Sequence, residues 1–262
     1  MPHIDLDTTS DLNKKAKILC TFGWRMALAG AETRLIMRCC HDMAKALHVI
    51  NPEFTLTRSF FLVRCCDGNS RFAERIAKIK SLGINMNSVT RLNFIANDVI
   101  SGEITDLDLI YHKIRAVRPA HYSKNMLIPI ESFAAAAFAY CNGGSLTVCL
   151  AALIGGFMLM FFKFWLLKKG FFETFVFMAC AFLGCATTYI MCTYVLNASA
   201  DETRLAIMAT TLLLVPGFPY MNGFLDIFKG YLEIGVMRLV YSIILTACAA
   251  SGLLGALYLM WI

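Results

Sequence analysis

Hydrophobic and polar positions follow different patterns on the two sides of residue 124. Residues 1–124 combine helical and strand periodicities with many charged positions, whereas residues 125–262 consist mainly of long apolar segments. Long apolar segments are typical of membrane-spanning helices. We therefore predict an α+β domain over residues 1–124 and a transmembrane helical domain over residues 125–262.

The N-terminal half predicts four helices, most of them beginning after a residue that can cap the first turn. These helices are expected from Asp11, capped by Thr9 or Ser10; from Ala31 to about His48; up to Ile100, capped by Asn87 or Ser88; and after Thr105.

Strand signals lie between the second and third of these helices. Phe54–Cys65 is rich in β-branched and aromatic residues and predicts one strand. Cys66-Asp67-Gly68-Asn69 has the composition of a turn. Arg71–Lys80 fits either a helix or a strand, and its place after that turn favours a partner strand.

The C-terminal half contains about five apolar segments, from which we expect a bundle of about five transmembrane helices. They are roughly Met126–Cys141, Leu146–Phe162, Phe175–Leu196, Leu205–Phe224 and Ile234–Ile262. The first two are short for a full span, which needs about 20 residues. Small residues such as Gly155 and Gly156 permit close packing of membrane helices, within the chain or between copies in a homo-oligomer.

One of these segments is interrupted by Pro216-Gly217-Phe218-Pro219. A helix that begins near Leu205 reaches Pro216 after about a dozen residues, or roughly 18 Å. Because a bilayer core is about 30 Å thick, the break falls inside the membrane. Broken helices at this depth occur where transporters bind substrate. The alternative is a simple proline kink, with the polar residues downstream lying at the interface.

Composition and charge agree with a membrane protein and suggest its orientation. The chain is 58% hydrophobic with a mean hydropathy of +0.62. Its net charge of +6 resides in residues 1–124, and the remainder is neutral. If the N-terminus is cytoplasmic, the C-terminus is periplasmic and only Arg204 of the later basic residues lies outside. The others then lie on the cytoplasmic side, as positive residues usually do: Lys163, Lys168, Lys169, Lys229 and Arg238.

No pattern indicates an enzyme, a metal site or a cofactor. The sequence has no nucleophile–base pair, no metal-ligand spacing and no glycine-rich phosphate loop. Its 11 cysteines suit reduced thiols in the cytoplasm rather than a disulfide framework. The basic excess is diffuse, which favours lipid headgroups over nucleic acid as a neighbour.

The order of several motifs resembles the threonine/serine exporter family, and the resemblance covers nearly the whole chain. The motifs are Gly30-Ala31-Glu32-Thr33-Arg34; Ser101-Gly102-Glu103-Ile104; Gly143-Gly144-Ser145; and Leu214-Val215-Pro216-Gly217 with Asn222, Asp226, Gly230, Gly235 and Arg238 downstream. Many relatives carry an acid soon after the Gly-Gly-Ser turn. Leu146-Thr147-Val148 follows here, so a role for that acid does not transfer.

The resemblance is to the larger subunit of the two-gene branch, and it implies a small multi-span membrane subunit as partner in the bacterial inner membrane. The implied function is export of small carboxylates from the cytoplasm, with succinate-like dicarboxylates as first choice. Two alternatives stay open: a threonine/serine amino-acid exporter subunit, and a regulatory or scaffold subunit of such an exporter.

These motifs supply the candidate site residues. Pro216 and Gly217 would expose backbone N–H groups that favour a substrate carboxylate. Asn222 would hydrogen-bond the substrate, and Asp226 would carry the coupling proton or pair with Arg238. The N-terminal motif adds Gly30, Glu32 and Arg34. Glu131, one turn into the first apolar segment, is a second candidate for coupling or an interfacial anchor.

Overall fold

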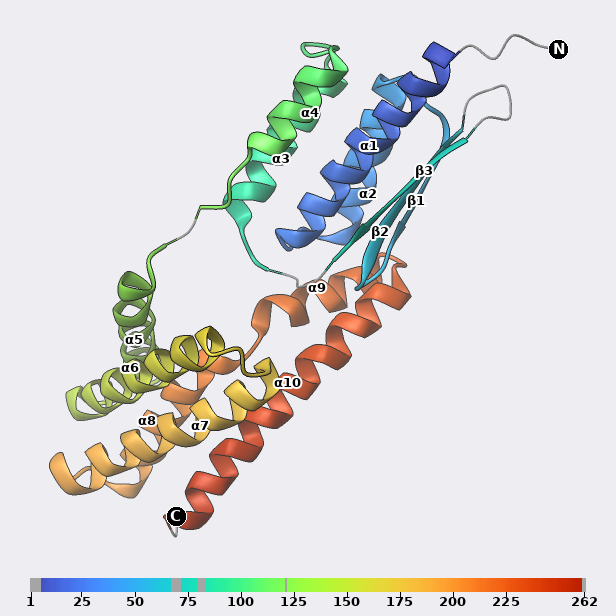
Figure 1. Ribbon diagram of the computed structural model, residues 1–262. Coiled ribbons are helices and arrows are strands. Elements are labelled where there is room, and N and C mark those ends of the chain that lie inside the picture. The colour runs from blue at the N-terminus through green and yellow to red at the C-terminus, as the bar shows by residue number, and fades with distance from the viewer. Residues whose placement is uncertain (1–5, 67–71, 80–82, 121, 261–262) are drawn as a thin grey trace. The chain divides into compact units, whose positions relative to one another are not determined.

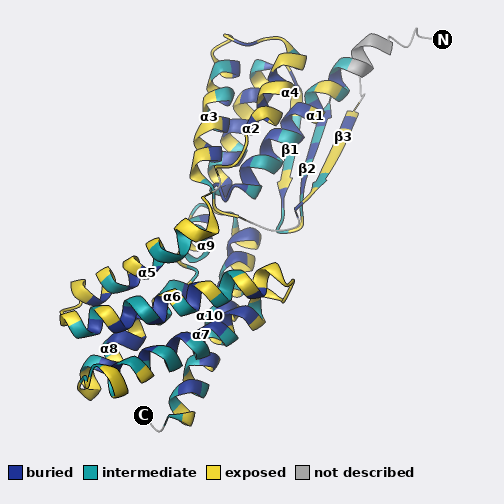
Figure 2. Cartoon of the chain, turned by 60° about the vertical axis from the view of Figure 1, so that its left-hand side comes forward, coloured by how far each residue is buried: buried dark blue, intermediate teal, exposed yellow. Residues whose placement is uncertain are grey.

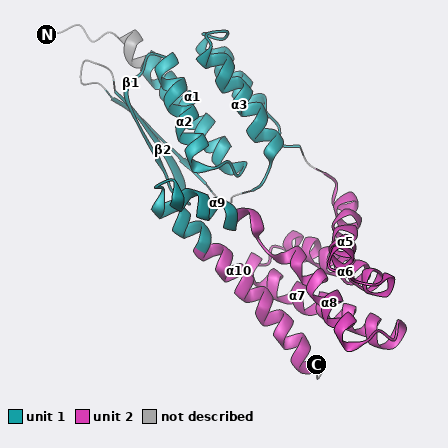
Figure 3. Ribbon diagram, turned by 180° about the vertical axis from the view of Figure 1, so that it is seen from behind, with its two compact units in different colours: residues 1–121, 220–239 teal, residues 122–219, 240–262 magenta. Residues whose placement is uncertain are grey.

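The computed structural model describes residues 6–66, 72–79, 83–120 and 122–260, with side chains from residue 11 onward. These residues are mostly helical with one small sheet (Figure 1). They form two compact units: residues 1–121 with 220–239, and residues 122–219 with 240–262 (Figure 3). We call these the first and the second unit.

The first unit packs helices against an antiparallel sheet in the order β1-β2-β3. Phe61 of β2 and Gly23 of the first helix meet so closely that a Cβ on Gly23 would lie 2.1 Å from the Phe61 ring. Its elements are α1 Leu6–Leu28, α2 Thr33–Ala46, β1 Ile50–Leu56, β2 Phe60–Cys66, β3 Phe72–Lys78, α3 Met86–Ile100 and α4 Leu107–Ala116.

The single strand predicted over Phe54–Cys65 is wrong, because a turn at Thr57 divides this stretch between β1 and β2. Thr57 Oγ1 accepts the backbone N–H groups of Ser59 at 3.3 Å and Phe60 at 3.1 Å. A threonine hydroxyl can thus stabilise a turn within a sequence of high strand propensity. β3 confirms the partner strand, while the predicted turn at Cys66–Asn69 falls largely outside the described residues.

Three predicted helix starts are displaced from their positions in the structure. α1 begins at Leu6, so Thr9 and Ser10 lie within it rather than before it. α3 is capped by Asn85, whose side chain accepts the Ser88 N–H at 2.9 Å, and α4 is capped by Asp106. Asn85 lies two residues before the predicted cap Asn87, and Asp106 lies one residue after the predicted cap Thr105. Asn and Asp cap at least as well as Ser or Thr.

Among the described residues, three helices are long and apolar enough to cross a membrane. They are α6, α7 together with the π-turn that extends it to Val195, and α10. The number rises to four if α8 and α9, bent by 62° at the Pro216 break, form one span. The expectation that the second apolar segment is short is wrong, since α6 continues for 23 residues through Lys168. The bounds are α5 Lys124–Cys141, α6 Leu146–Lys168, α7 Glu173–Ile190 with a π-turn Met191–Val195, α8 Ala200–Thr211 with a 3₁₀ turn Leu212–Leu214, α9 Gly217–Phe228 and α10 Leu232–Leu259.

Small residues allow the helices of the second unit to approach closely. A Cβ on Gly155 of α6 would lie 1.9 Å from the hydroxyl of Thr188 on α7. Thr188 and Thr210 of α8 are buried and share a hydrogen bond of 3.0 Å. Each hydroxyl also bonds a backbone carbonyl of its own helix. Large apolar side chains are exposed on the outer faces, where lipid can cover them (Figure 2).

Replacing Gly252 of α10 with alanine is expected to destabilise the second unit. Its added Cβ would lie 2.0 Å from the backbone oxygen of Met178 on α7, which cannot rotate away. Overpacking of this kind costs about 1–3 kcal/mol. Gly255→Ala is the matched control, because its Cβ meets only Phe182 at 3.8 Å. Thermal unfolding in detergent should rank Gly252→Ala well below Gly255→Ala, and equal midpoints would contradict this packing.

Candidate functional site

The turn between α1 and α2 is shaped by a glycine that ends the first helix. Gly30 has φ +80°, a left-handed conformation that costs glycine little. Gly30 N–H bonds the Ala27 carbonyl at 3.1 Å, and Ala31 N–H bonds that of Met26 at 3.1 Å. This pattern is a common helix C-terminus. It leaves the Gly30 and Ala31 carbonyls directed away from their own helix and available to other partners.

A second helical hairpin, formed by α9 and α10, supplies those partners. Gly230 has φ +86° and ends α9, and Tyr231 N–H bonds the Asp226 carbonyl at 2.8 Å. A Cβ on Gly235 would lie 2.8 Å from the Gly223 carbonyl oxygen. The two helices therefore approach backbone to backbone at Gly223 and Gly235. This close approach places Asp226 of α9 beside Arg238 of α10.

Asp226 and Arg238 form a buried ion pair at the centre of the site. Arg238 Nη1 lies 2.8 Å from Asp226 Oδ2, and the two residues are 5% and 0% exposed. The backbone N–H of Thr33, the first residue of α2, donates to Asp226 Oδ1 at 3.2 Å. A carboxylate is favoured at a helix N-terminus, where the backbone N–H groups and helix dipole are positive. Arg238 Nη2 also donates to the Ala31 carbonyl at 3.4 Å.

Two further contacts connect the same turn to α9. Asn222 Nδ2 donates to the Gly30 carbonyl at 3.1 Å, and Lys229 Nζ pairs with the Glu32 carboxylate. Glu32 and Lys229 are each about a quarter exposed, so water screens this pair more than the buried one. Glu32 is the residue before α2, and its side chain is bound to α9.

The structure brings five of the candidate residues together: Gly30, Glu32, Asn222, Asp226 and Arg238. Arg34 lies apart from them on α2 and is exposed. Glu131 is half-buried on α5, in the second unit. Pro216 and Gly217 mark the predicted helix break, where the chain leaves a 3₁₀ turn and begins α9 at Gly217. Nothing in the described part of the chain lies within 4 Å of a Cβ built on Gly217.

Sequence reasoning missed the pairing of Glu32 with Lys229 and the bond from Thr33 to Asp226. Gly223 and Gly235, each three residues before Asp226 or Arg238, were a usable signal. A helical hairpin that packs at glycines brings its polar residues together. No comparable signal connects the Gly30 turn to α9, since nearly 200 residues separate Gly30 from Asn222.

The arrangement is chemically a closed charge network. Two carboxylates, Glu32 and Asp226, face two cations, Lys229 and Arg238. A ligand carboxylate that replaced Asp226 at the buried Arg238 would displace a side-chain carboxylate, whereas Lys229 is partly exposed and keeps donors free of Glu32. No cluster of three or more His, Cys, Asp or Glu with metal-binding geometry occurs among the described residues. Burial also raises the pKa of Cys20 and of Cys65 to about 11, so these thiols stay protonated.

A polytopic helical protein with a buried ion pair beside a broken apolar helix has the features of a membrane transporter. Comparison with known proteins agrees. The profile described as "Putative threonine/serine exporter" matches residues 17–260, and the chain belongs to this family, ThrE.

Two relatives are each described as "Probable succinate transporter subunit YjjP". The protein from Klebsiella aerogenes is 27% identical over 235 residues, which cover 88% of both chains. The protein from Escherichia coli K12 is 26% identical over 231 residues, which cover 87% of this chain and 88% of the relative. No solved structure matches the chain.

Replacing Arg238 with glutamine is expected to destabilise the protein far more than replacing Lys229. Arg238→Gln leaves the Asp226 carboxylate buried without its cation, which costs about 3–5 kcal/mol. Lys229→Gln removes one member of a partly exposed pair, for which about 1 kcal/mol or less is expected. Each change removes one positive charge, so the second is a control for the first. Thermal unfolding of both variants measures the difference, and similar losses would show that burial does not set the strength of these pairs.

Proposed function

We propose that this chain is one subunit of a secondary transporter that exports small carboxylates from the cytoplasm, with succinate-like dicarboxylates as the substrate class. The proposal follows the descriptions of the two relatives and of the family. The observation that carries it is the buried Asp226–Arg238 pair on the hairpin that directly follows the helix break. Buried charges are expensive to desolvate, and buried ionisable groups cluster at functional sites.

The mechanism proposed here is an exchange of carboxylates within the charge network. A substrate carboxylate would approach the N-terminus of α9 at Gly217, where the helix dipole favours an anion. Protonation of Asp226 would release Arg238 to bind a substrate carboxylate. Asn222 would then exchange the Gly30 carbonyl for the substrate. Because these groups hold the α1–α2 turn, substrate binding would also release that turn.

The membrane arrangement is part of the proposal. Residues 1–124 would form a cytoplasmic domain and residues 125–262 a domain of about five spans, with α5 as the fifth. The N-terminus would be cytoplasmic and the C-terminus periplasmic in the bacterial inner membrane, as the lysine and arginine distribution favours.

A reporter fused after Ile262 should be active only outside the cytoplasm, and cytoplasmic activity would contradict this orientation.

We also propose that the transporter contains a second chain, because the relatives are described as subunits. By the resemblance, that chain is a small multi-span membrane protein, YjjB-like. The substrate path would then be completed by helices from both chains.

Asp226→Asn and Pro216→Ala are each expected to reduce succinate export about tenfold, equivalent to about 1.4 kcal/mol in the rate-limiting barrier. The first removes the group that exchanges with substrate, and the second permits a continuous helix through the break. Asp201→Asn is the matched control. This aspartate on α8 is 94% exposed and pairs only with exposed Arg204 among the described residues, so export should be unchanged.

The measurement is the rate at which preloaded cells release labelled succinate, normalised to the amount of the protein in the membrane. Normal export by both Asp226→Asn and Pro216→Ala at normal protein levels would rule out the mechanism. Equal loss in Asp201→Asn would show that the effect is not specific to the buried pair.

A further inference from the structure

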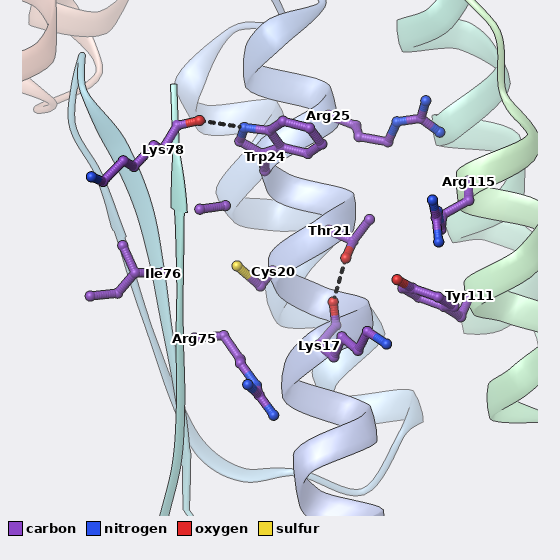
Figure 4. Close-up of a pocket in the computed structure, with 11 residues that line it drawn as sticks. Lys17, Cys20, Thr21, Trp24, Arg25, Arg75, Ile76, Lys78, Tyr111 and Arg115 are labelled. Atoms are coloured by element: carbon purple, nitrogen blue, oxygen red, sulfur yellow. Dashed lines mark hydrogen bonds between the residues drawn. The ribbon is translucent and has the colours of Figure 1, made fainter. Parts of the chain in front are cut away.

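A cavity of about 670 Å³ in the first unit lies outside the charge network described above. It is a groove over α1, with β3 on one side and α4 on the other (Figure 4). We call it the α1–β3–α4 groove. Its volume is within the range of small-molecule sites in proteins. The lining residues are Lys17, Cys20, Thr21, Trp24, Arg25, Arg75, Ile76, Ala77, Lys78, Tyr111 and Arg115.

Four cationic side chains from three elements line this groove. Lys17 and Arg25 extend from α1, Arg75 from β3 and Arg115 from α4, whereas the Lys78 side chain points away beyond the strand (Figure 4). No aspartate or glutamate is among the lining residues. None of the four cations forms an ion pair within the described parts of the chain.

The interactions that hold these cations in place do not neutralise them. Lys17 Nζ lies 4.3 Å from the centre of the Tyr111 ring, and the Arg115 guanidinium carbon lies 5.7 Å from it. Arg25 donates to the Ile114 carbonyl, and Arg75 Nη2 donates to Asn13 Oδ1 at 3.4 Å. A ring face, a carbonyl and an amide all attract a cation without carrying a charge. The positive charge of the groove is therefore left for a ligand to balance.

Arg25 is the one partly buried cation of the four, and Arg115 lies near enough to act on its charge. Burial lowers the pKa of the Arg25 guanidinium, and the nearby charge of Arg115 lowers it further. The walls of the groove are fixed, since Trp24 Nε1 donates to the Lys78 carbonyl at 2.9 Å and connects α1 to β3. Lys17, Arg75 and Arg115 are exposed, so water screens their mutual repulsion, and a cluster of like charges on fixed walls favours binding of an anion.

We propose that the α1–β3–α4 groove binds a small anion that carries two or more phosphate groups. Four cations exceed the charge of a dicarboxylate and match that of a di- or triphosphate. Three of them are arginines, whose planar guanidinium groups bind phosphate oxygens in pairs. The phosphates come either from a soluble molecule or from a lipid headgroup. Bound there, the anion connects α1, β3 and α4, and so controls the domain that carries the Gly30 turn.

The test uses the full chain purified in mild detergent, with pyrophosphate as the soluble probe and calorimetry as the readout. We expect saturable binding that weakens as salt is added. Arg75→Gln and Arg115→Gln should each weaken it about tenfold or more, the loss expected when a charge-assisted hydrogen bond is removed. Arg91→Gln, which removes an exposed arginine from α3 outside the groove, should leave the affinity unchanged.

A second arm distinguishes the two phosphate sources. The chain is placed in lipid nanodiscs with or without cardiolipin, whose headgroup carries two phosphates, and pyrophosphate binding is measured again. Competition by cardiolipin, or binding of cardiolipin alone that is lost in Arg75→Gln and Arg115→Gln, identifies a lipid headgroup. Pyrophosphate binding that cardiolipin does not affect identifies a soluble ligand. Binding of neither probe overturns the proposal, as does equal loss in Arg91→Gln.

Thermal unfolding without ligand separates charge repulsion from a structural role. Arg115→Gln relieves repulsion in the empty groove, so its unfolding midpoint should equal or exceed that of the unchanged protein. A lower midpoint would mean that Arg115 holds the fold together, which contradicts the proposal. The outcome of the binding test does not depend on the proposed transport function. Pyrophosphate binding can be found or excluded whether or not the chain exports succinate.

Discussion

The site depends on the requirement that a buried charge be neutralised. Asp226 has no exposed surface, and its carboxylate is balanced by Arg238 and by the first backbone N–H of α2. Leaving either charge alone at such depth would cost several kcal/mol. The pair forms only because Gly223 and Gly235 let α9 and α10 approach closely. One electrostatic constraint thus fixes both the α9–α10 hairpin and the α1–α2 turn against it.

In the proposed mechanism, this constraint gives the polar residues of the hairpin two roles. As a closed network, Asp226, Arg238, Glu32 and Lys229 stabilise the first unit. In the proposed transport cycle, the same cations would exchange these carboxylates for that of a substrate. The two roles are compatible, because a transporter needs an element with two arrangements that ligand binding can bias. The α1–α2 turn is the element that we propose for this role, because its contacts with α9 and α10 are hydrogen bonds and ion pairs.

The sequence predicted the class of fold and the helix break because both depend on local signals. Apolar segment length indicates membrane helices, and Pro216 with Gly217 interrupts one of them. Hydrophobic pattern alone did not locate the turn at Thr57, which depends on a hydroxyl bonding nearby backbone. The contacts of Glu32 and Thr33 with α9 were beyond prediction for a different reason. They join residues almost 200 positions apart in the chain. A single sequence does not indicate which residues so far apart are in contact.

The most direct test of the account is ligand binding by the protein isolated from membranes in mild detergent with any chain that co-purifies. Succinate and threonine are compared by their effect on the thermal unfolding midpoint. The account predicts a small multi-span partner and a rise in the midpoint with succinate that threonine does not produce. A rise with threonine alone, or with neither ligand despite an intact complex, would contradict it.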